Sequence, residues 1–255
     1  MFQIDLNSDL GESFGSYKLG LDDEVLAFVT SANVACGWHA GDPLVMDRTV
    51  ALAADRGVFV GAHPGFPDLL DFGRRNNDVT PKEAYAYTKY QLGAFFGFAK
   101  AHGLPVQHIK PHGALYNMCA KNSDLSFEVC RAVREFDDSI IVMGLAGSEL
   151  LKAARDQGLR AAGEFFADRA YNGDGTLVSR RLPGSVITDE NAAIARTVRM
   201  AKEGVVETID GADIPIVCQS VCVHGDNAHA VAFVKKIRRR LSDEGISVTA
   251  LRNIV

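Results

Sequence analysis

Short runs of β-forming residues alternate with longer segments of helical period along most of the chain. This alternation is typical of a parallel sheet whose strands are joined by crossover helices. We expect strands at 2–7, 31–36, 58–62, 106–110, 139–144, 160–165 and 216–223. We expect helices at 22–29, 43–56, 80–102, 123–136, 147–157, 188–203 and 227–243. About seven such units favour a closed or nearly closed β/α barrel, although strand order cannot be read from a sequence and an open sheet stays possible.

Two helix starts carry clear capping signals. Asp42 and Thr80 each precede a proline that would take the first position of a helix. Thr80 is followed three residues later by Glu83, which is the pattern of a capping box. These signals predict helices that begin at residues 43 and 81.

Nearly every predicted strand ends in polar side chains. They are Asp5, Asn7, Asp9 and Glu12 on the first strand and beyond it, Asn33, Cys36 and His39 on the second, His63 on the third, His108, Lys110 and His112 on the fourth, Glu164, Asp168 and Arg169 on the sixth, and His224 and Asp226 on the last. The carboxyl ends of barrel strands form the active face, so these positions are expected to converge on one site. Strand alternation should turn Gln3, Asp5 and Asn7 into the barrel.

Each of these residues also has a simpler structural interpretation. A single Asp at a strand end is more often a cap or a turn residue, which is how we interpret Asp42, Asp68 and Asp189. For Asp9 and Glu12 the two interpretations are evenly balanced. The histidines His102 and His229, on predicted helices, are expected to be structural. The histidines at strand ends are favoured as functional: His39, His63, His112 and His224.

Lys110 is the strongest single candidate, because a lysine inside a strand must face water, a site or a buried partner. Near carboxylates such as Glu164 or Asp5 it would stay charged and hold a substrate carboxylate or a developing oxyanion. Without a partner it would lose its proton and serve as a base. The sequence leaves both states open.

A metal site is an alternative use of the same residues. Asp or Glu with two or three histidines from neighbouring strand ends would bind zinc or another divalent ion and activate water. The chain has no compact HExxH spacing, and Cys36-Gly-Trp-His39 is a weak signal by itself. A divalent metal therefore stays a minority prediction, based on ligand type without ligand spacing.

Composition narrows the class of protein. The chain has 255 residues, a formal net charge of -5 and a sequence pI near 5.8, so nucleic acid and anionic membrane surfaces are disfavoured as partners. No stretch approaches the roughly 20 apolar residues of a membrane span, and the N-terminus does not resemble a signal peptide. We expect one cytoplasmic domain over residues 1–255. Five cysteines without paired spacing are expected to be reduced and mostly buried.

Several catalytic motifs are missing from the sequence. No segment matches GxxxxGK[ST], and no GxGxxG follows a predicted strand, so the chain shows no recognised nucleotide cradle. There is no GxSxG elbow, and no cysteine has the sequence context of a nucleophile. Covalent acyl-enzyme chemistry is therefore disfavoured.

Six segments in order resemble the LamB/YcsF family. They are DLNSDLGESFG at 5–15, SANVACGWHAGDP at 31–43, VGAHPGFPD at 60–68, KPHGALYN at 110–117, EFFADRAY at 164–171 and VCVHGDN at 221–227. The resemblance runs from the first strand to the last helix. Trp38 and Phe66 depart from the residues that we expect to be usual at their loop positions, which would change the pocket wall and not the chemistry.

The resemblance implies a fold and an activity. The fold is similar to the distorted seven-stranded β/α barrel of certain glycosidases and polysaccharide deacetylases. Members of the family act with two partner subunits in the ATP-dependent opening of the 5-oxoproline lactam to L-glutamate. We group as candidate catalytic residues Asp5, Glu12, His63, Lys110, His112, Glu164 and His224, and as candidate substrate-binding residues Asn7, Asn33, His39, Asp168, Arg169 and Asp226. ATP would be bound by the partner subunits, which fits the missing cradle.

The implied reaction leaves several roles open. Asp5, Glu12, His63 or Glu164 would be the general base that activates water. Lys110 or Arg169 would bind the substrate carboxylate or a phosphate. Two other functions use the same polar site: a metal-dependent, deacetylase-like hydrolase of carbohydrates or amides, and a non-catalytic subunit that binds substrate for a partner.

Overall fold

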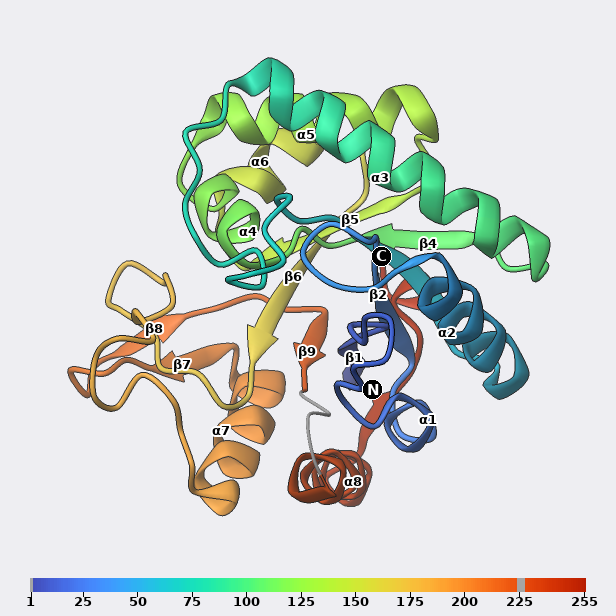
Figure 1. The fold of residues 1–255 in the computed structure, drawn as a ribbon. Helices are drawn as coiled ribbons and strands as arrows, with labels where there is room; N and C mark the ends of the chain where they lie inside the picture. The colour runs from blue at the N-terminus through green and yellow to red at the C-terminus, as the bar shows by residue number, and fades with distance from the viewer. Residues whose placement is uncertain (1, 224–227) are drawn as a thin grey trace.

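Seven parallel strands close into a barrel in the computed structural model, which describes residues 2–223 and 228–255 (Figure 1). In sheet order they are β1 (Phe2–Leu10), β2 (Ser31–Ala35), β3 (Phe59–His63), β4 (Val106–Ile109), β5 (Ile141–Leu145), β6 (Ala161–Phe166) and β9 (Ser220–Cys222). The barrel is closed because β1 pairs with both β2 and β9. The predicted barrel is confirmed, and the open sheet is excluded.

The strand β1 pairs with two different strands along one of its edges. Its first half, Phe2–Ile4, pairs with β10 (Ile246–Val248), whereas its second half, Asp5–Asn7, pairs with β9. This change of partner partway along β1 is a visible source of distortion in the barrel. After β10, the short helix η1 (Leu251–Asn253) places Leu251 against Ile141, Met143 and Ala162, in a small buried cluster apart from the main core. The sequence did not predict β10 or η1.

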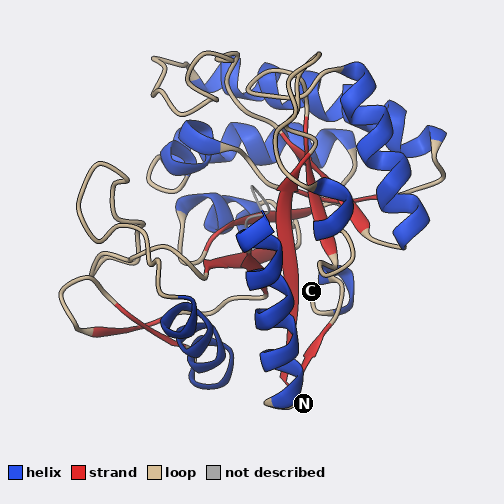
Figure 2. Ribbon diagram, turned by 60° about the horizontal axis from the view of Figure 1, so that its bottom comes forward, coloured by secondary structure: helices blue, strands red, loops and turns tan. Residues whose placement is uncertain are grey.

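Helices surround the strands. They are α1 (Asp22–Val25), α2 (Pro43–Arg56), α3 (Pro81–Ala101), α4 (Gly113–Cys119), α5 (Ser123–Phe136), α6 (Glu149–Asp156), α7 (Glu190–Glu203) and α8 (Ala228–Asp243) (Figure 2). The predicted caps are confirmed: Asp42 accepts hydrogen bonds from the amides of Leu44 and Val45, and Thr80 forms a capping box with Glu83. None of the described helices is long and apolar enough to cross a membrane.

The predictions differ from the structure in a few elements. The first helix covers only Asp22–Val25 instead of 22–29, and α4 was not expected, because its few residues follow a strand end directly. Two short strands, β7 (Val205–Glu207) and β8 (Asp213–Pro215), form a separate antiparallel hairpin that lies beside α7 at the lower left of Figure 1. The last barrel strand is β9, shorter than the predicted 216–223.

Alternation along β1 separates the core from the site as predicted for residues 4–7, whereas Gln3, which was expected to point into the barrel, is exposed. Ile4 and Leu6 are buried in the apolar core, whereas Asp5 and Asn7 are fully buried among polar groups. Small residues make room inside the barrel. A Cβ atom on Gly61 would come within 2.4 Å of the His108 ring, so only glycine fits there. The cysteines are all free, and all but half-buried Cys218 are buried, which confirms the expectation of mostly buried thiols.

Candidate active site

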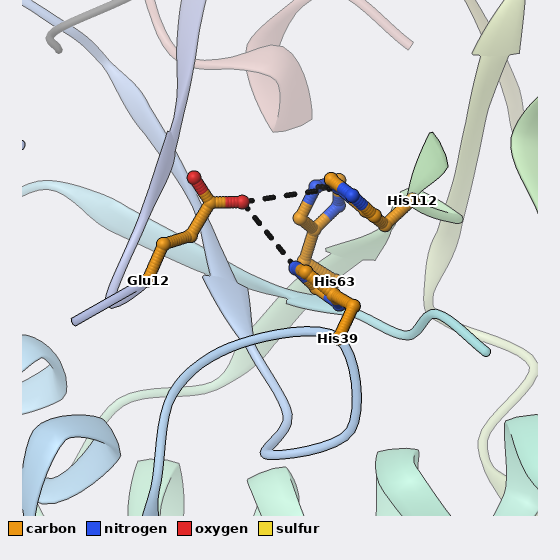
Figure 3. Close-up of side chains that lie close together, drawn as sticks. All are labelled: Glu12, His39, His63 and His112. Carbon is orange, nitrogen blue, oxygen red and sulfur yellow. Dashed lines mark hydrogen bonds and ion pairs between the residues drawn. The ribbon is translucent and has the colours of Figure 1, made fainter. Parts of the chain in front are cut away.

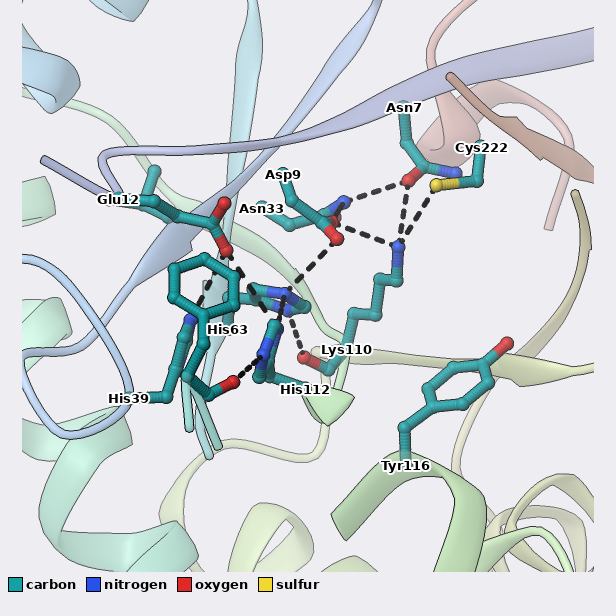
Figure 4. A network of polar contacts seen from close by, with 12 residues as sticks. Asn7, Asp9, Glu12, Asn33, His39, His63, Lys110, His112, Tyr116 and Cys222 are labelled. Atoms are coloured by element: carbon teal, nitrogen blue, oxygen red, sulfur yellow. Dashed lines mark hydrogen bonds and ion pairs between the residues drawn. The ribbon is translucent and has the colours of Figure 1, made fainter. Parts of the chain in front are cut away.

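The strand ends bring most of the predicted polar side chains together in two adjoining groups. We call the first the lysine network: Asn7, Asp9, Asn33, Lys110, Tyr116, Glu164 and Cys222. Figure 4 labels all of these residues except Glu164. We call the second the histidine cluster: Glu12, His39, His63 and His112 (Figure 3). The residues come from the ends of β1, β2, β3, β4, β6 and β9 and the segments that follow them, as the barrel geometry predicts.

Lys110 lies at the centre of the lysine network and is only 2% exposed. Its Nζ atom is 2.7 Å from Oε1 of Glu164 and 2.9 Å from Oδ1 of Asp9. Burial alone would lower the pKa of Lys110, but these two carboxylates outweigh it and hold the pKa well above its ordinary value. Of the two states left open by the sequence, the charged ammonium is therefore the one that this environment favours.

Asp9 links the two groups. Its Oδ1 accepts hydrogen bonds from Lys110 and from the Asn33 amide at 2.8 Å, and its Oδ2 lies 3.3 Å from Nε2 of His63. Burial would raise the pKa of Asp9, but His63 and Lys110 together hold it well below its usual range. The carboxylate is thus ionised. Asp9 was not among the residues that the resemblance placed in the catalytic and binding sets, although its parity with Asp5 and Asn7 was the signal that places it inside.

Asp5 lies below the network and has no exposed surface. Its carboxylate accepts hydrogen bonds from the hydroxyl groups of Thr30, Ser31 and Ser220. Burial raises the pKa of Asp5 to about 6, and these hydrogen bonds offset only part of the effect. Ser220 in turn accepts a hydrogen bond from the Asn7 amide at 2.7 Å. This arrangement supports Asn7 from beneath.

The other residues of the network fix its floor and wall. His108 contacts the amide oxygen of Asn33 through Nε2 at 2.7 Å, and burial lowers the pKa of His108 to about 3, so the ring is neutral. Tyr116 donates a hydrogen bond of 2.7 Å to Oε2 of Glu164. The sequence missed Tyr116 as a site residue because α4 was not expected, although the residue lies inside the segment KPHGALYN.

The histidine cluster is almost completely buried. His39 and His112 stack with parallel rings whose centroids are 3.7 Å apart, and His63 meets His112 edge-on. Nε2 of His39 is 3.3 Å from Oε1 of Glu12, and Nε2 of His63 is 2.9 Å from Nδ1 of His112. Burial, reinforced by the neighbouring rings, lowers the pKa of His39 well below its ordinary value and that of His112 to about 3.

The segment 64–79 covers this cluster. Phe72 lies edge-on to His39 and His112, and its carbonyl oxygen is 2.8 Å from Nε2 of His112. The backbone of Phe72 has φ +55, which is unusual for a residue with a side chain. The segment is braced by Asp68, which accepts hydrogen bonds from Arg75 and from the amide of Asp71. This confirms Asp68 as a turn residue.

The remaining predicted site residues are Asp168, Arg169, His224 and Asp226. Arg169 is buried, and its guanidinium donates hydrogen bonds to the carbonyl groups of Val178 and Ser185, so it ties the segment 167–187 to the end of β6. Asp168 accepts a hydrogen bond from the amide of Ile187 through its own carbonyl. The predictions for His224 and Asp226 lie outside the described residues.

Fold and site together define the class: a closed parallel β/α barrel with one site of acidic, lysine and histidine residues at the carboxyl ends of its strands. More particularly, the chain belongs to the LamB/YcsF family, whose profile matches residues 4–255. The resemblance in the sequence motifs is thereby confirmed.

Known relatives cover the whole chain. A protein from Campylobacter jejuni subsp. jejuni, named as the A subunit of 5-oxoprolinase, is 58% identical over 255 residues, which is 100% of both chains. The crystal structure of a lactam utilization protein from Thermus thermophilus matches with a TM-score of 0.92 and 42% identity, over 97% of this chain and 99% of that one. A T48 deacetylase, at 15% identity and a TM-score of 0.50 over 99% and 90% of the two chains, shares the fold alone. The expected deacetylase-like barrel is confirmed.

Proposed function

We propose that this chain is the A subunit of an ATP-dependent 5-oxoprolinase, a hydrolase that opens the cyclic amide of 5-oxoproline to give L-glutamate. Full-length similarity to a protein with that name supports this assignment. The structural observation that carries it is the buried, charged Lys110 between Asp9 and Glu164, beside the histidine cluster. In this proposal two partner subunits bind ATP and activate the lactam, and the complex works in the cytoplasm.

The chemistry of the lactam sets the demands on the site. A five-membered lactam is a stable amide until a phosphoryl group on its carbonyl oxygen activates the ring carbon. Water then adds to that carbon, and the adduct must lose the ring nitrogen, because loss of phosphate would regenerate the lactam. The water must give up a proton and the nitrogen must gain one before the C–N bond breaks. The acyl phosphate that remains takes up a second water to give glutamate and phosphate.

Asp9 meets both demands in this proposal. Its ionised carboxylate takes the proton from water and, once protonated, passes it to the ring nitrogen. Its side chain is 19% exposed, whereas those of Glu164 and Lys110 are 0% and 3% exposed. Lys110 keeps its charge and stabilises the negative charge of the phosphoryl group and the charge that develops on the oxygen that water adds to the ring carbon. Asp5 and Glu164, two of the bases suggested by the sequence, lie deeper and accept hydrogen bonds from neighbouring hydroxyl groups.

A divalent metal ion at the histidine cluster is part of the proposal. Glu12, His39, His63 and His112 offer four ligand atoms that lie within 4.8 Å of one another, which fits such an ion. Bound there, the ion would supply Lewis-acid polarisation of an oxygen atom next to Asp9.

The test is glutamate formation from 5-oxoproline by the chain alone and by the chain mixed with its two partner subunits, with and without ATP. Activity only in the full mixture with ATP is expected. Asp9→Asn should lower kcat by about 10²–10⁴, the usual contribution of a general base. Lys110→Ala and His63→Ala should abolish activity, whereas His102→Ala, which removes a surface histidine paired with Asp47, should not.

Two outcomes would overturn the proposal in different ways. Hydrolysis of an amide or a sugar acetate by the chain alone, without ATP but lost on chelation, would identify a metal-dependent, deacetylase-like hydrolase. If Lys110→Ala and Asp9→Asn weakened substrate binding but left the rate of a single turnover unchanged in the complex, the chain would be a non-catalytic binding subunit.

A further inference from the structure

Two main-chain carbonyl groups fix the protonation of two rings in the histidine cluster. The carbonyl oxygen of Lys110 lies 2.7 Å from Nδ1 of His63, and the carbonyl oxygen of Phe72 lies 2.8 Å from Nε2 of His112. A carbonyl oxygen only accepts hydrogen bonds, so each of these ring nitrogens carries a hydrogen. A neutral imidazole has one N–H. Unless a further proton or another cation is present, the other nitrogens, Nε2 of His63 and Nδ1 of His112, therefore present lone pairs.

These two lone pairs face each other. The nitrogens are 2.9 Å apart, and Nε2 of His63 also faces Oδ2 of Asp9 at 3.3 Å, which is another acceptor. Glu12 adds a further acceptor, with Oε1 3.8 Å from Nδ1 of His112. Acceptors that face one another in a buried space repel, so the arrangement requires a cation among them. A single shared proton or a metal ion satisfies this requirement.

The number of the groups favours a metal ion over a shared proton. Four ligand atoms gather from four separate segments and lie within 4.8 Å of one another. Ligands around a tetrahedral zinc ion are about 3.3–3.4 Å apart, from metal–nitrogen distances of about 2.0–2.1 Å. Three of the six separations in the cluster are 2.9, 3.3 and 3.8 Å, which lie on either side of this value, and all of them are within 4.8 Å.

We propose that the histidine cluster binds one divalent transition-metal ion through Nε2 of His39, Nε2 of His63, Nδ1 of His112 and a carboxylate oxygen of Glu12. Three imidazole ligands select zinc, cobalt or a similar ion over magnesium and calcium, which prefer oxygen. These four ligands complete a tetrahedral set, so water or substrate would reach the ion by expansion to five coordination. This inference rests on the proposed function in that it specifies the metal ion included there, but its binding test needs neither ATP nor the partner subunits, so the two can fail separately.

Two of the proposed ligands, His63 and His112, each have a hydrogen-bond acceptor next to the ring nitrogen that does not face the metal position. Histidines bound to a metal usually donate their other N–H to a carbonyl or carboxylate group, and Lys110 and Phe72 supply such carbonyl groups here. The left-handed backbone at Phe72 turns its carbonyl toward His112. Gly73 follows with φ +64, and a Cβ atom there would lie 2.7 Å from Cβ of His39. The segment 64–79 therefore fits closely over the His39 and His112 rings.

Cobalt and zinc binding to the full-length chain tests this proposal. Protein stripped with a chelator is titrated with Co²⁺ and followed by visible absorption, and Zn²⁺ is then added in competition. We expect one Co²⁺ per chain with the intense bands of tetrahedral cobalt, displaced by one Zn²⁺. His112→Ala and Glu12→Gln should each weaken Co²⁺ binding by about 100-fold or more. His102→Ala, a matched loss of one histidine outside the cluster, should bind like the unmodified chain.

The variants must be shown to be folded by circular dichroism and thermal unfolding. Glu12→Gln keeps the size of a side chain that is 13% exposed, so it remains informative if His112→Ala does not fold. Absence of stoichiometric binding by the folded, unmodified chain would overturn the metal site and leave the shared proton as the cation. Unchanged affinity in Glu12→Gln and His112→Ala would overturn it as well, because binding would then occur elsewhere.

Discussion

Replacing Lys110 by methionine should strongly destabilise the chain. Methionine has a similar length but removes the ammonium, which now lies 2.9 Å from the carboxylate of Asp9 and 2.7 Å from that of Glu164. Breaking a buried ion pair in this way costs about 3–5 kcal/mol in the free energy of unfolding. Because Glu164 has no exposed surface, water cannot replace the ammonium around it. We therefore expect the upper part of that range at pH 7.

Urea unfolding of the isolated chain measures this cost, and a second substitution identifies its cause. Lys110→Met combined with Glu164→Gln removes the cation together with one of the two charges, so the double variant should recover about 1–3 kcal/mol of the loss. The deficit of Lys110→Met should also shrink as the pH falls from 7 toward 4, because the uncompensated carboxylates then take up protons.

A matched control uses the exposed Lys89, whose ammonium pairs with Glu135 on the surface. Lys89→Met should cost less than about 1 kcal/mol. If Lys110→Met costs no more than this control, or if its deficit does not depend on pH, the two carboxylates do not hold a charged Lys110 and the reasoning about the network is wrong.

Three further predictions test other parts of the site. The pKa of Asp5 is raised to about 6 in the folded chain, so as the pH rises the unfolded chain loses this proton at a lower pH than the folded chain does. The free energy of unfolding should therefore fall by about 2–3 kcal/mol between pH 4 and pH 7. Asp5→Asn should abolish that dependence in urea unfolding. Gly73→Ala should lower Co²⁺ affinity about 10–100-fold, whereas Gly15→Ala, with similar backbone strain but no atom within 4 Å, should not change it. Arg169→Met should expose the segment 167–187 to limited proteolysis, and unchanged cleavage would contradict the role of its hydrogen bonds.

Alternation in single strands predicted the buried polar face, but it could not show how far a strand extends. The first strand was expected to end at residue 7, whereas β1 continues to Leu10 because β2 pairs with it as far as that residue. Asp9 thereby falls inside the barrel, in phase with Asn7. The pattern of DLNSDL was visible in the sequence, yet only the pairing partner decides whether the last residues belong to the strand.

The distances between strands were also beyond the sequence. It placed His39, His63 and His112 at three strand ends but had no ligand spacing from which to predict a metal site, because the ligands come from separate segments. The register of neighbouring strands, such as Ala35 opposite His63, brings them together. In contrast, Arg169 lies just beyond the predicted strand but turns into its own loop, because carbonyl groups of the segment 167–187 accept its hydrogen bonds.

The lysine network and the histidine cluster are connected through residues that contact both groups. Lys110 contributes its ammonium to the first and its main-chain carbonyl to His63 in the second, and Asp9 contributes one carboxylate oxygen to each. A shift of the end of β4 would therefore disturb the charge balance of the network and the orientation of the His63 ring together. Lys110 can hold both groups in place because it directly follows β4 and its amide donates a hydrogen bond of 3.0 Å to the carbonyl oxygen of Ala62, which fixes its backbone.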